Sequence, residues 1–399
     1  MEQEGKGRIL LVWLWCFRFR VLSFAERKAS AFLQKADIRI NGSRPWDIQV
    51  HNDKFFLRLL LHGTIALGES YVDGWWDCHA IDQFIYRVLR GGLVNMKTGS
   101  FKGLGIPFIS TLRLLGPILT NRQTKKRSAR DIRYTYDLGN DVFIATLDKQ
   151  MSYSCGYWKN ASTLDEAQEE KHDLICRKLH LKPGMKLLEI GCGFGGFARF
   201  AAEKYGVHVV GITTSKNHYT FATEYCRGTS VKILQQDYRE IQGKFDRIVC
   251  IEMMEHVGPK NHQQFIETVF NALLPDGLFL LQSISISESV IRNDPWIDKY
   301  IFPGTVPLSA KQIADATEGF FCILDWHNFT KDYYRTMLAW HDNFERHWES
   351  LKGKYDDRFR RLWKFYLLCC PATALAGTHH LWQIVFSRID SDKAYERVS

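Results

Sequence analysis

The chain has 399 residues, of which 45% are hydrophobic and 24% charged, and its formal net charge is +9. This length and composition describe a globular protein with sizeable cores and room for two domains. No run reaches 18 apolar residues, which argues against a membrane-spanning helix. The most apolar segment, residues 9–17, is followed by Arg18-Phe-Arg20, a poor signal-peptide cleavage site, so a buried or surface N-terminal helix is favoured over export.

Residues 1–120 carry short helical patterns separated by turns, for example at 40–45 and 67–76, and predict a smaller, mainly helical domain. The densest basic run, 121–133, is predicted to be a linker between two domains. Its cations could meet nucleic-acid phosphates or anionic lipid head groups, or the run could be a solvated linker helix. No nucleic-acid-binding fingerprint accompanies it, so lipid is the favoured partner and nucleic acid is not expected.

From residue 134 to 399 the pattern alternates between strands and helices. Helices are expected at 196–205 and 261–273, and strands at 186–190, 208–212, 231–235, 247–251, 278–283 and 383–387. This alternation predicts an α/β fold with a doubly wound, mostly parallel sheet. Ligands of such sheets bind at the carboxyl ends of the strands, where Glu189, Asp237 and Glu255 fall.

The segment 187–196 reads as a strand, a tight turn and a helix start. Glycines in such a turn permit positive φ and a close approach of the backbone to a cofactor. The spacing also fits a dinucleotide fingerprint, but residues 209–215 lack the acidic residue that would bind a ribose. Glu189, just before the turn, can instead meet the cationic amino acid part of a sulfonium cofactor. The order of motifs therefore looks like that of an S-adenosylmethionine methyltransferase of class I.

Ten cysteines are scattered from Cys16 to Cys370 without a C-x-x-C pair or a matching Cys/His ligand spacing. The sequence thus predicts neither a metal site nor a disulfide framework, and favours a reducing, cytoplasmic setting.

Five motifs resemble those of the cyclopropane fatty-acid synthases: LGESYVDGWW (67–76), YDLGND (136–141), YSCGYW (153–158), EHVGPKN (255–261) and PWIDKYIFP (295–303). The resemblance covers nearly all of the chain after residue 30. It implies a lipid-engaging N-terminal domain, a methyltransferase domain, and methylene transfer from S-adenosylmethionine to the cis double bond of unsaturated phospholipid acyl chains. It further implies a protein held peripherally at the inner face of the membrane, with a homodimer left open.

The resemblance also assigns site residues. A bound bicarbonate serves the family as base, and its holders correspond to the backbone of Cys155 and the side chains of Glu255 and Tyr333. The fourth holder is usually histidine but is Gln282 here, which can donate a hydrogen bond but cannot relay a proton. The cofactor residues implied, besides Glu189, are Tyr153, Ser154, Gly191, Gly193, Gly195, Thr213, Thr214, Asp237 and Tyr238.

Several of these residues have a plain structural alternative. Tyr153 could be a core aromatic residue, Thr213 and Thr214 a helix N-cap pair, and Asp237 a turn former. Cys370, which matches a family cysteine near the lipid site, is better explained as an ordinary buried thiol.

Two further departures from the family pattern are Thr135, in place of a histidine, and residues 374–377, in place of a segment that carries an arginine. Three hypotheses therefore stand: cyclopropane formation, formation of a methylene- or methyl-branched chain, and a lipid-binding relative that has lost turnover. The presence of Glu255, Tyr333 and the glycine turn argues against the third.

Overall fold

The computed structural model describes residues 20–102, 120–136, 139–392 and 394–398. The apolar segment 9–17 lies outside these residues. Contacts between residues divide the chain into two compact units, and neither unit is continuous in sequence. The first takes its described residues from Met1–Leu115, Asp294–Trp296 and Asp356–Ala372, and the second from Gly116–Asn293, Ile297–Tyr355 and Thr373–Ser399.

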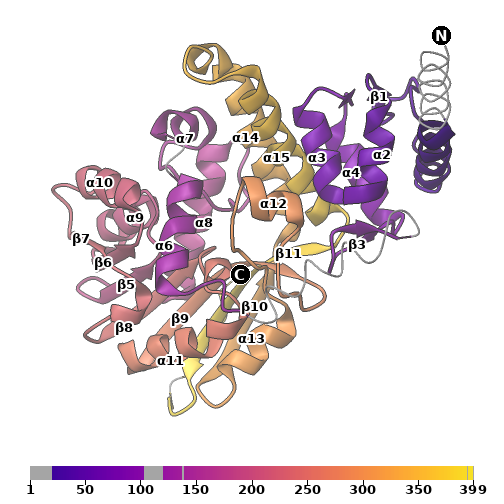
Figure 1. Cartoon of the computed structure of the whole chain (residues 1–399). Coiled ribbons are helices and arrows are strands. Elements are labelled where there is room, and N and C mark those ends of the chain that lie inside the picture. Colours follow the sequence, from indigo (N-terminus) through magenta and orange to yellow (C-terminus); the bar gives the residue numbers. More distant parts are fainter. Residues whose placement is uncertain (1–19, 103–119, 137–138, 393, 399) are drawn as a thin grey trace, which may run out of the picture. The chain divides into compact units, whose positions relative to one another are not determined.

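The first unit is mainly helical, as the sequence predicts (Figure 1). Its helices include α2 (Lys54–His62), α3 (Thr64–Val72) and α4 (Ile81–Arg90), and its short strand pairs are β1 (Gln49–Val50) with β2 (Trp76–Asp77) and β3 (Val94–Asn95) with β4 (Ser100–Phe101). Trp76 lies at the centre, fully buried, with its indole nitrogen donating to the carbonyl of Leu67 at 3.0 Å. Four aromatic rings surround it: Phe55, Tyr71, Phe84 and Phe365. The motif at 67–76 therefore supplies the core of this unit.

The second unit is built on a seven-stranded sheet with the order β10-β11-β9-β8-β5-β6-β7. The five strands from β9 to β7 are parallel to one another, and β11 runs antiparallel to both of its neighbours, β9 and β10. The bounds are β5 (Lys186–Ile190), β6 (His208–Thr213), β7 (Val231–Gln235), β8 (Phe245–Ile251), β9 (Leu273–Ile286), β10 (Phe321–Asn328) and β11 (His379–Arg388). The predicted fold class is confirmed, although β10, an edge strand, was not predicted.

Helices cover both faces of this sheet (Figure 1). Alternate residues of β9 show why: Phe279 and Leu281 pack with α11 and α13, while Leu278 and Leu280 pack with α8 and α9 on the opposite face. The helices of this unit are α6 (Lys125–Tyr136), α7 (Asn140–Thr146), α8 (Leu164–Lys178), α9 (Gly196–Tyr205), α10 (Lys216–Tyr225), α11 (His262–Ala272), α13 (Ala310–Thr317) and α14 (Thr330–Leu351). Helix α12 (Pro295–Tyr300) is divided between the two units, and most of α15 (Asp357–Leu375) belongs to the first. Part of the predicted linker, 121–133, is thus the start of α6.

Among the described residues, no helix is long and apolar enough to cross a membrane. The same residues hold no group of three or more His, Cys, Asp or Glu side chains placed to bind a metal ion.

Candidate active site

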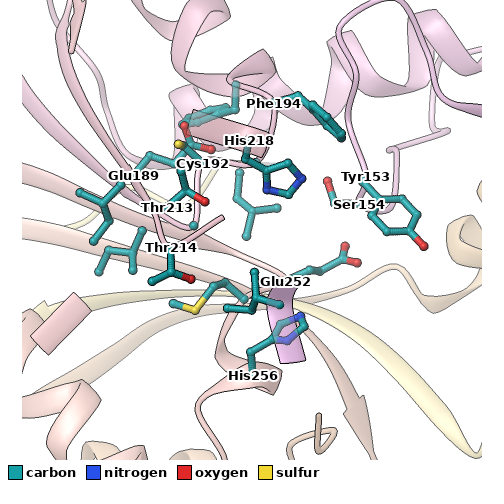
Figure 2. A pocket seen from close by; sticks show the side chains of 18 of the residues that line it. Tyr153, Ser154, Glu189, Cys192, Phe194, Thr213, Thr214, His218, Glu252 and His256 are labelled. Atoms are coloured by element: carbon teal, nitrogen blue, oxygen red, sulfur yellow. The ribbon is translucent and has the colours of Figure 1, made fainter. Parts of the chain in front are cut away.

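A cavity opens at the carboxyl ends of β5, β6 and β8 in the second unit (Figure 2). Nine of the ten predicted cofactor residues border it: Tyr153, Ser154, Glu189, Gly191, Gly193, Thr213, Thr214, Asp237 and Tyr238. Gly195 does not, and neither do Cys155, Glu255, Gln282 or Tyr333 among the described residues. Sequence reasoning missed several others that line the cavity, above all Lys171 and Glu252.

Two glycines of the turn, Gly193 and Gly195, have different structural roles. Gly193 has φ +52°, and a Cβ built on it would meet no atom within 4 Å, so it faces open space in the cavity wall. Gly195 has φ +88°, and its Cβ would lie 2.9 Å from the sulfur of Cys226. Gly193 therefore leaves room for a ligand, whereas Gly195 allows the start of α9 to pack closely against α10.

Glu189 ends up buried, and that burial raises its pKa to about 8, with the charge of Lys171 opposing the shift. Its Oε2 has no hydrogen-bond partner among the described residues. Buried carboxylate oxygens are normally bonded, so this atom suits a cationic donor supplied by a ligand. The residues present thus fit the ammonium group of S-adenosylmethionine.

Lys171 comes from α8 and is almost completely buried, with its Nζ donating to Ser154 Oγ at 2.8 Å. Burial lowers its pKa, while Asp148, Glu252 and Glu189 act in the opposite direction. A lysine in a predominantly charged helix gives no sequence signal of burial, which explains why it was not singled out.

The polar residues on β6 and after β7 combine structural and cavity-facing roles. Ser215, not Thr213 or Thr214, is the N-cap of α10, because its hydroxyl accepts from the amide of His218. Thr214 Oγ1 has no hydrogen-bond partner among the described residues and borders the cavity. Asp237 caps the 3-10 helix Tyr238–Glu240 and also pairs with Arg239 at 3.1 Å. Its proposed turn-forming role is therefore real, and it borders the cavity as well.

Glu252 directly follows β8, and its carboxylate joins two residues that were expected to hold an anion. Its Oε1 accepts from the amide of Cys155 at 2.8 Å and from Gln282 Nε2 at 2.7 Å. Gln383 on β11 donates to Gln282 Oε1 at 2.9 Å, which fixes the Gln282 amide with its NH₂ group toward Glu252. Burial raises the pKa of Glu252, and the two hydrogen bonds and Lys171 moderate the shift.

Glu255 lies one turn further on, in the 3-10 helix Met254–His256, and faces β9. Its Oε1 accepts from the amide of Ile284 and, at 3.1 Å, from Ser283 Oγ. Burial first, and then the charge of Glu252, raise its pKa to about 8. This shift favours the protonated form of Glu255, which relieves the repulsion between the two carboxyl groups.

Helix α14 holds the Cys155 segment in place. Thr336 Oγ1 accepts from the amide of Gly156 at 3.1 Å, and Asp332 accepts from the amide of Trp158 at 2.9 Å. Tyr333 is buried in the same turn of α14. Burial holds the pKa of the Cys155 thiol well above its usual range, so its backbone amide, not its thiolate, is the group it offers.

The mostly parallel sheet, the glycine turn and the cavity beside Glu189 define the class of S-adenosylmethionine-dependent methyltransferases. Residues 123–384 match the family model described as mycolic acid cyclopropane synthetase, and the chain belongs to this family. The resemblance found in the sequence is thereby confirmed.

Relatives agree. The chain is 47% identical over 362 residues, 91% of its length and 93% of the relative's, to the cyclopropane-fatty-acyl-phospholipid synthase of Escherichia coli K12. It is 29% identical over 350 residues, 83% of its length and 80% of the relative's, to the tuberculostearic acid methyltransferase UfaA1 of Mycobacterium tuberculosis. The structure of the mycolic acid cyclopropane synthase CmaA1 complexed with SAH and CTAB matches with 28% identity and a TM-score of 0.60, covering 65% of this chain and 97% of that one.

Proposed function

We propose that the protein transfers a methylene group from S-adenosylmethionine to the cis double bond of unsaturated phospholipid acyl chains and so forms cyclopropane fatty acids. The observation that carries this proposal is the cofactor cavity bordered by Gly193, Glu189 and Glu252. The 47% identity to a cyclopropane-fatty-acyl-phospholipid synthase supports it.

The chemistry explains the residue types. An alkene is a weak nucleophile, so the site must hold it in line with the sulfonium methyl group and exclude water. Attack on the methyl group leaves a carbocation on the acyl chain, and ring closure needs a base that takes a proton from the new methyl group. Within this site Glu189 and the glycine turn would hold the cofactor, and the buried anionic cluster would stabilise the cation.

The bicarbonate that the family resemblance implies would be held by the Cys155 amide, Glu255, Tyr333 and Gln282. In this chain the Cys155 amide and the Gln282 side chain both donate to Glu252 instead. The donors present therefore do not fit a bicarbonate in that place, and we derive no step through it.

Membrane contact is the finer part of the proposal. We infer that the first unit engages lipid, and that the protein acts in the cytoplasm, peripherally at the inner membrane face, because its substrate is a membrane phospholipid. In the basic run, Arg122 pairs with Asp298 at 2.9 Å and Lys125 with Glu240 at 2.7 Å, so these two cations are partly neutralised. Lys126, which follows Lys125 in α6, is exposed.

A vesicle-sedimentation assay tests the membrane contact. Binding to anionic vesicles should weaken as salt rises, because exposed charges are screened over about 8 Å at physiological ionic strength. Lys126→Glu should weaken binding further, while Lys311→Glu, in α13, serves as the charge-matched control. Salt-independent binding, or equal binding by both variants, would count against a role of the basic run in membrane contact. A homodimer stays a prediction, and the sedimentation coefficient from a sedimentation-velocity experiment would test it.

One lipid analysis tests the function itself. Expression in a host that makes unsaturated phospholipids but no cyclopropanes should yield cyclopropane acyl chains on gas chromatography and mass spectrometry. Methylene- or methyl-branched chains would instead favour the second hypothesis, and unchanged lipids the loss of turnover.

A further inference from the structure

We propose that Glu252 is the base that removes the proton from the transferred methyl group, so that this protein carries in its own chain the anion that a bound bicarbonate was expected to supply. The inference rests on the proposed function and deepens it, because it assigns the ring-closing step to one residue.

The first argument is the position of the Glu252 carboxylate. The groups that converge on it are the Cys155 amide at 2.8 Å and Gln282 Nε2 at 2.7 Å, two of the four groups expected to hold the anion. Glu252 also borders the cofactor cavity, which Glu255 and Gln282 do not among the described residues. Figure 2 shows its carboxylate in the space between Tyr153, Ser154 and His256. Of the two neighbouring carboxyl groups, Glu252 is thus the one placed at the cofactor.

The second argument is charge. A bicarbonate in contact with Glu252 would place two anions side by side in a buried site, an arrangement that is disfavoured unless a proton is shared. The buried cation nearby is Lys171, whose charge acts on Glu252 and Glu189 alike. Burial and the charge of Glu252 raise the pKa of Glu255, whereas the Cys155 amide, Gln282 and Lys171 all favour the ionised form of Glu252, so Glu252 is the better placed of the two to act as a base.

The third argument is the backbone. Glu252 has φ +48°, in the left-handed region where glycine is the unstrained residue. A non-glycine residue persists there when its surroundings fix it, and such strain clusters at active sites. Two hydrogen bonds, from the Cys155 amide and from Gln282, fix the Glu252 side chain in this conformation. The strained conformation aims the carboxylate from the end of β8 into the cavity.

The step balances without another reactant. After methyl transfer the acyl chain carries a three-coordinate cationic carbon beside the carbon that bears the new methyl group. Glu252 takes one proton from that methyl group, and the electron pair of the broken C–H bond forms the bond to the cationic carbon and closes the ring. Gln282 cannot accept the proton, so Glu252 returns it to solvent through the cavity once the product has left.

The first test measures the turnover of the natural chain and of Glu252→Gln on vesicles of unsaturated phospholipid. Each protein is assayed once in ordinary buffer and once in buffer from which carbon dioxide, and with it bicarbonate, has been removed. The natural chain should change less than about twofold when bicarbonate is removed, while Glu252→Gln should lose about 10²–10⁴-fold in turnover, as for loss of a general base. Its affinity for S-adenosylmethionine, measured by calorimetry, should stay unchanged. Glu267→Gln, on the exposed side of α11, is the matched control and should keep full activity.

The second test is rescue. Glu252→Gly should open the space of the carboxylate while leaving the Cys155 amide and Gln282 free to bind an anion, so added bicarbonate should restore activity at least about tenfold. A natural chain that loses more than tenfold without bicarbonate, or a Glu252→Gln variant that keeps its turnover, overturns the proposal. If the natural chain binds S-adenosylmethionine yet makes no cyclopropane at all, the proposed function fails first, and the two failures are thereby distinguished.

Discussion

Replacing Gln282 by methionine should move the pH dependence of the reaction, not merely lower its rate. Gln282 is completely buried and donates at 2.7 Å to the Glu252 carboxylate. A hydrogen bond to a charged group contributes about 1.5–3 kcal/mol, and its loss leaves the ionised form of Glu252 that much less stable. At about 1.4 kcal/mol for each pH unit, the acidic limb of the rate profile should move up by about one to two units.

The sign follows from the groups around the carboxylate. Burial already raises the pKa of Glu252, and Gln282, the Cys155 amide and Lys171 lower it. Removal of one lowering group raises the pKa further, so the acidic limb of the variant's rate profile should lie at higher pH than that of the natural chain. The charge of Glu252 helps to raise the pKa of the neighbouring Glu255 to about 8, and this mutual repulsion should broaden the profile.

The assay is turnover on phospholipid vesicles between about pH 6 and pH 9, at saturating S-adenosylmethionine. Gln383→Met is the matched control, because it removes the bond that orients Gln282 but leaves the donor to Glu252, and its shift should be smaller. A profile for Gln282→Met that has the natural midpoint and a uniformly lower rate would refute this reasoning.

Two further predictions concern the cofactor. Gly193→Val should weaken S-adenosylmethionine binding by at least about 100-fold, because the side chain enters the cavity. Gly243→Val, also at positive φ with open space around it, should keep the natural affinity; equal losses in calorimetry would mean that strain alone is responsible. Because the pKa of Glu189 is raised to about 8, cofactor binding below that pH should release a proton, and affinity should rise with pH. Calorimetry in two buffers of different ionisation enthalpy measures that release, and Glu189→Gln should abolish it; a release that persists in the variant contradicts the assignment.

The fold was largely predictable because buried parallel strands are short apolar runs between turn residues. The prediction for β5 and β7 agrees with the structure at both ends. β10 was missed although residues 320–324 form a short apolar run, because such a run cannot be assigned to a strand or a helix by its pattern alone.

The site was predictable only in part. Residues of the glycine turn share one segment, so their common role can be read from local sequence. The cluster around Glu252 joins groups 97 and 30 residues away, and only the tertiary structure brings them together. The family motif that was used begins at Glu255, three residues later, so Glu252 was not singled out. The sequence offered one indication of this cluster: Gln282, the hydrogen-bond partner of Glu252, stands where the family usually has a histidine.

The strained conformation of Glu252 predicts a trade between stability and activity. A non-glycine residue in the left-handed region costs about 1–2 kcal/mol, so Glu252→Gly should relieve that strain, whereas Glu252→Ala removes the same carboxylate and keeps the strained backbone. Both variants leave the Cys155 amide and Gln282 without their acceptor, so this loss is the same in the two and cancels in the comparison. Glu252→Gly should therefore be more stable than Glu252→Ala by about 1 kcal/mol in urea unfolding, although both lack the proposed base. Equal midpoints with equal slopes would show that the backbone at this position is not strained in solution, and would remove the third argument for Glu252 while leaving the first two in place.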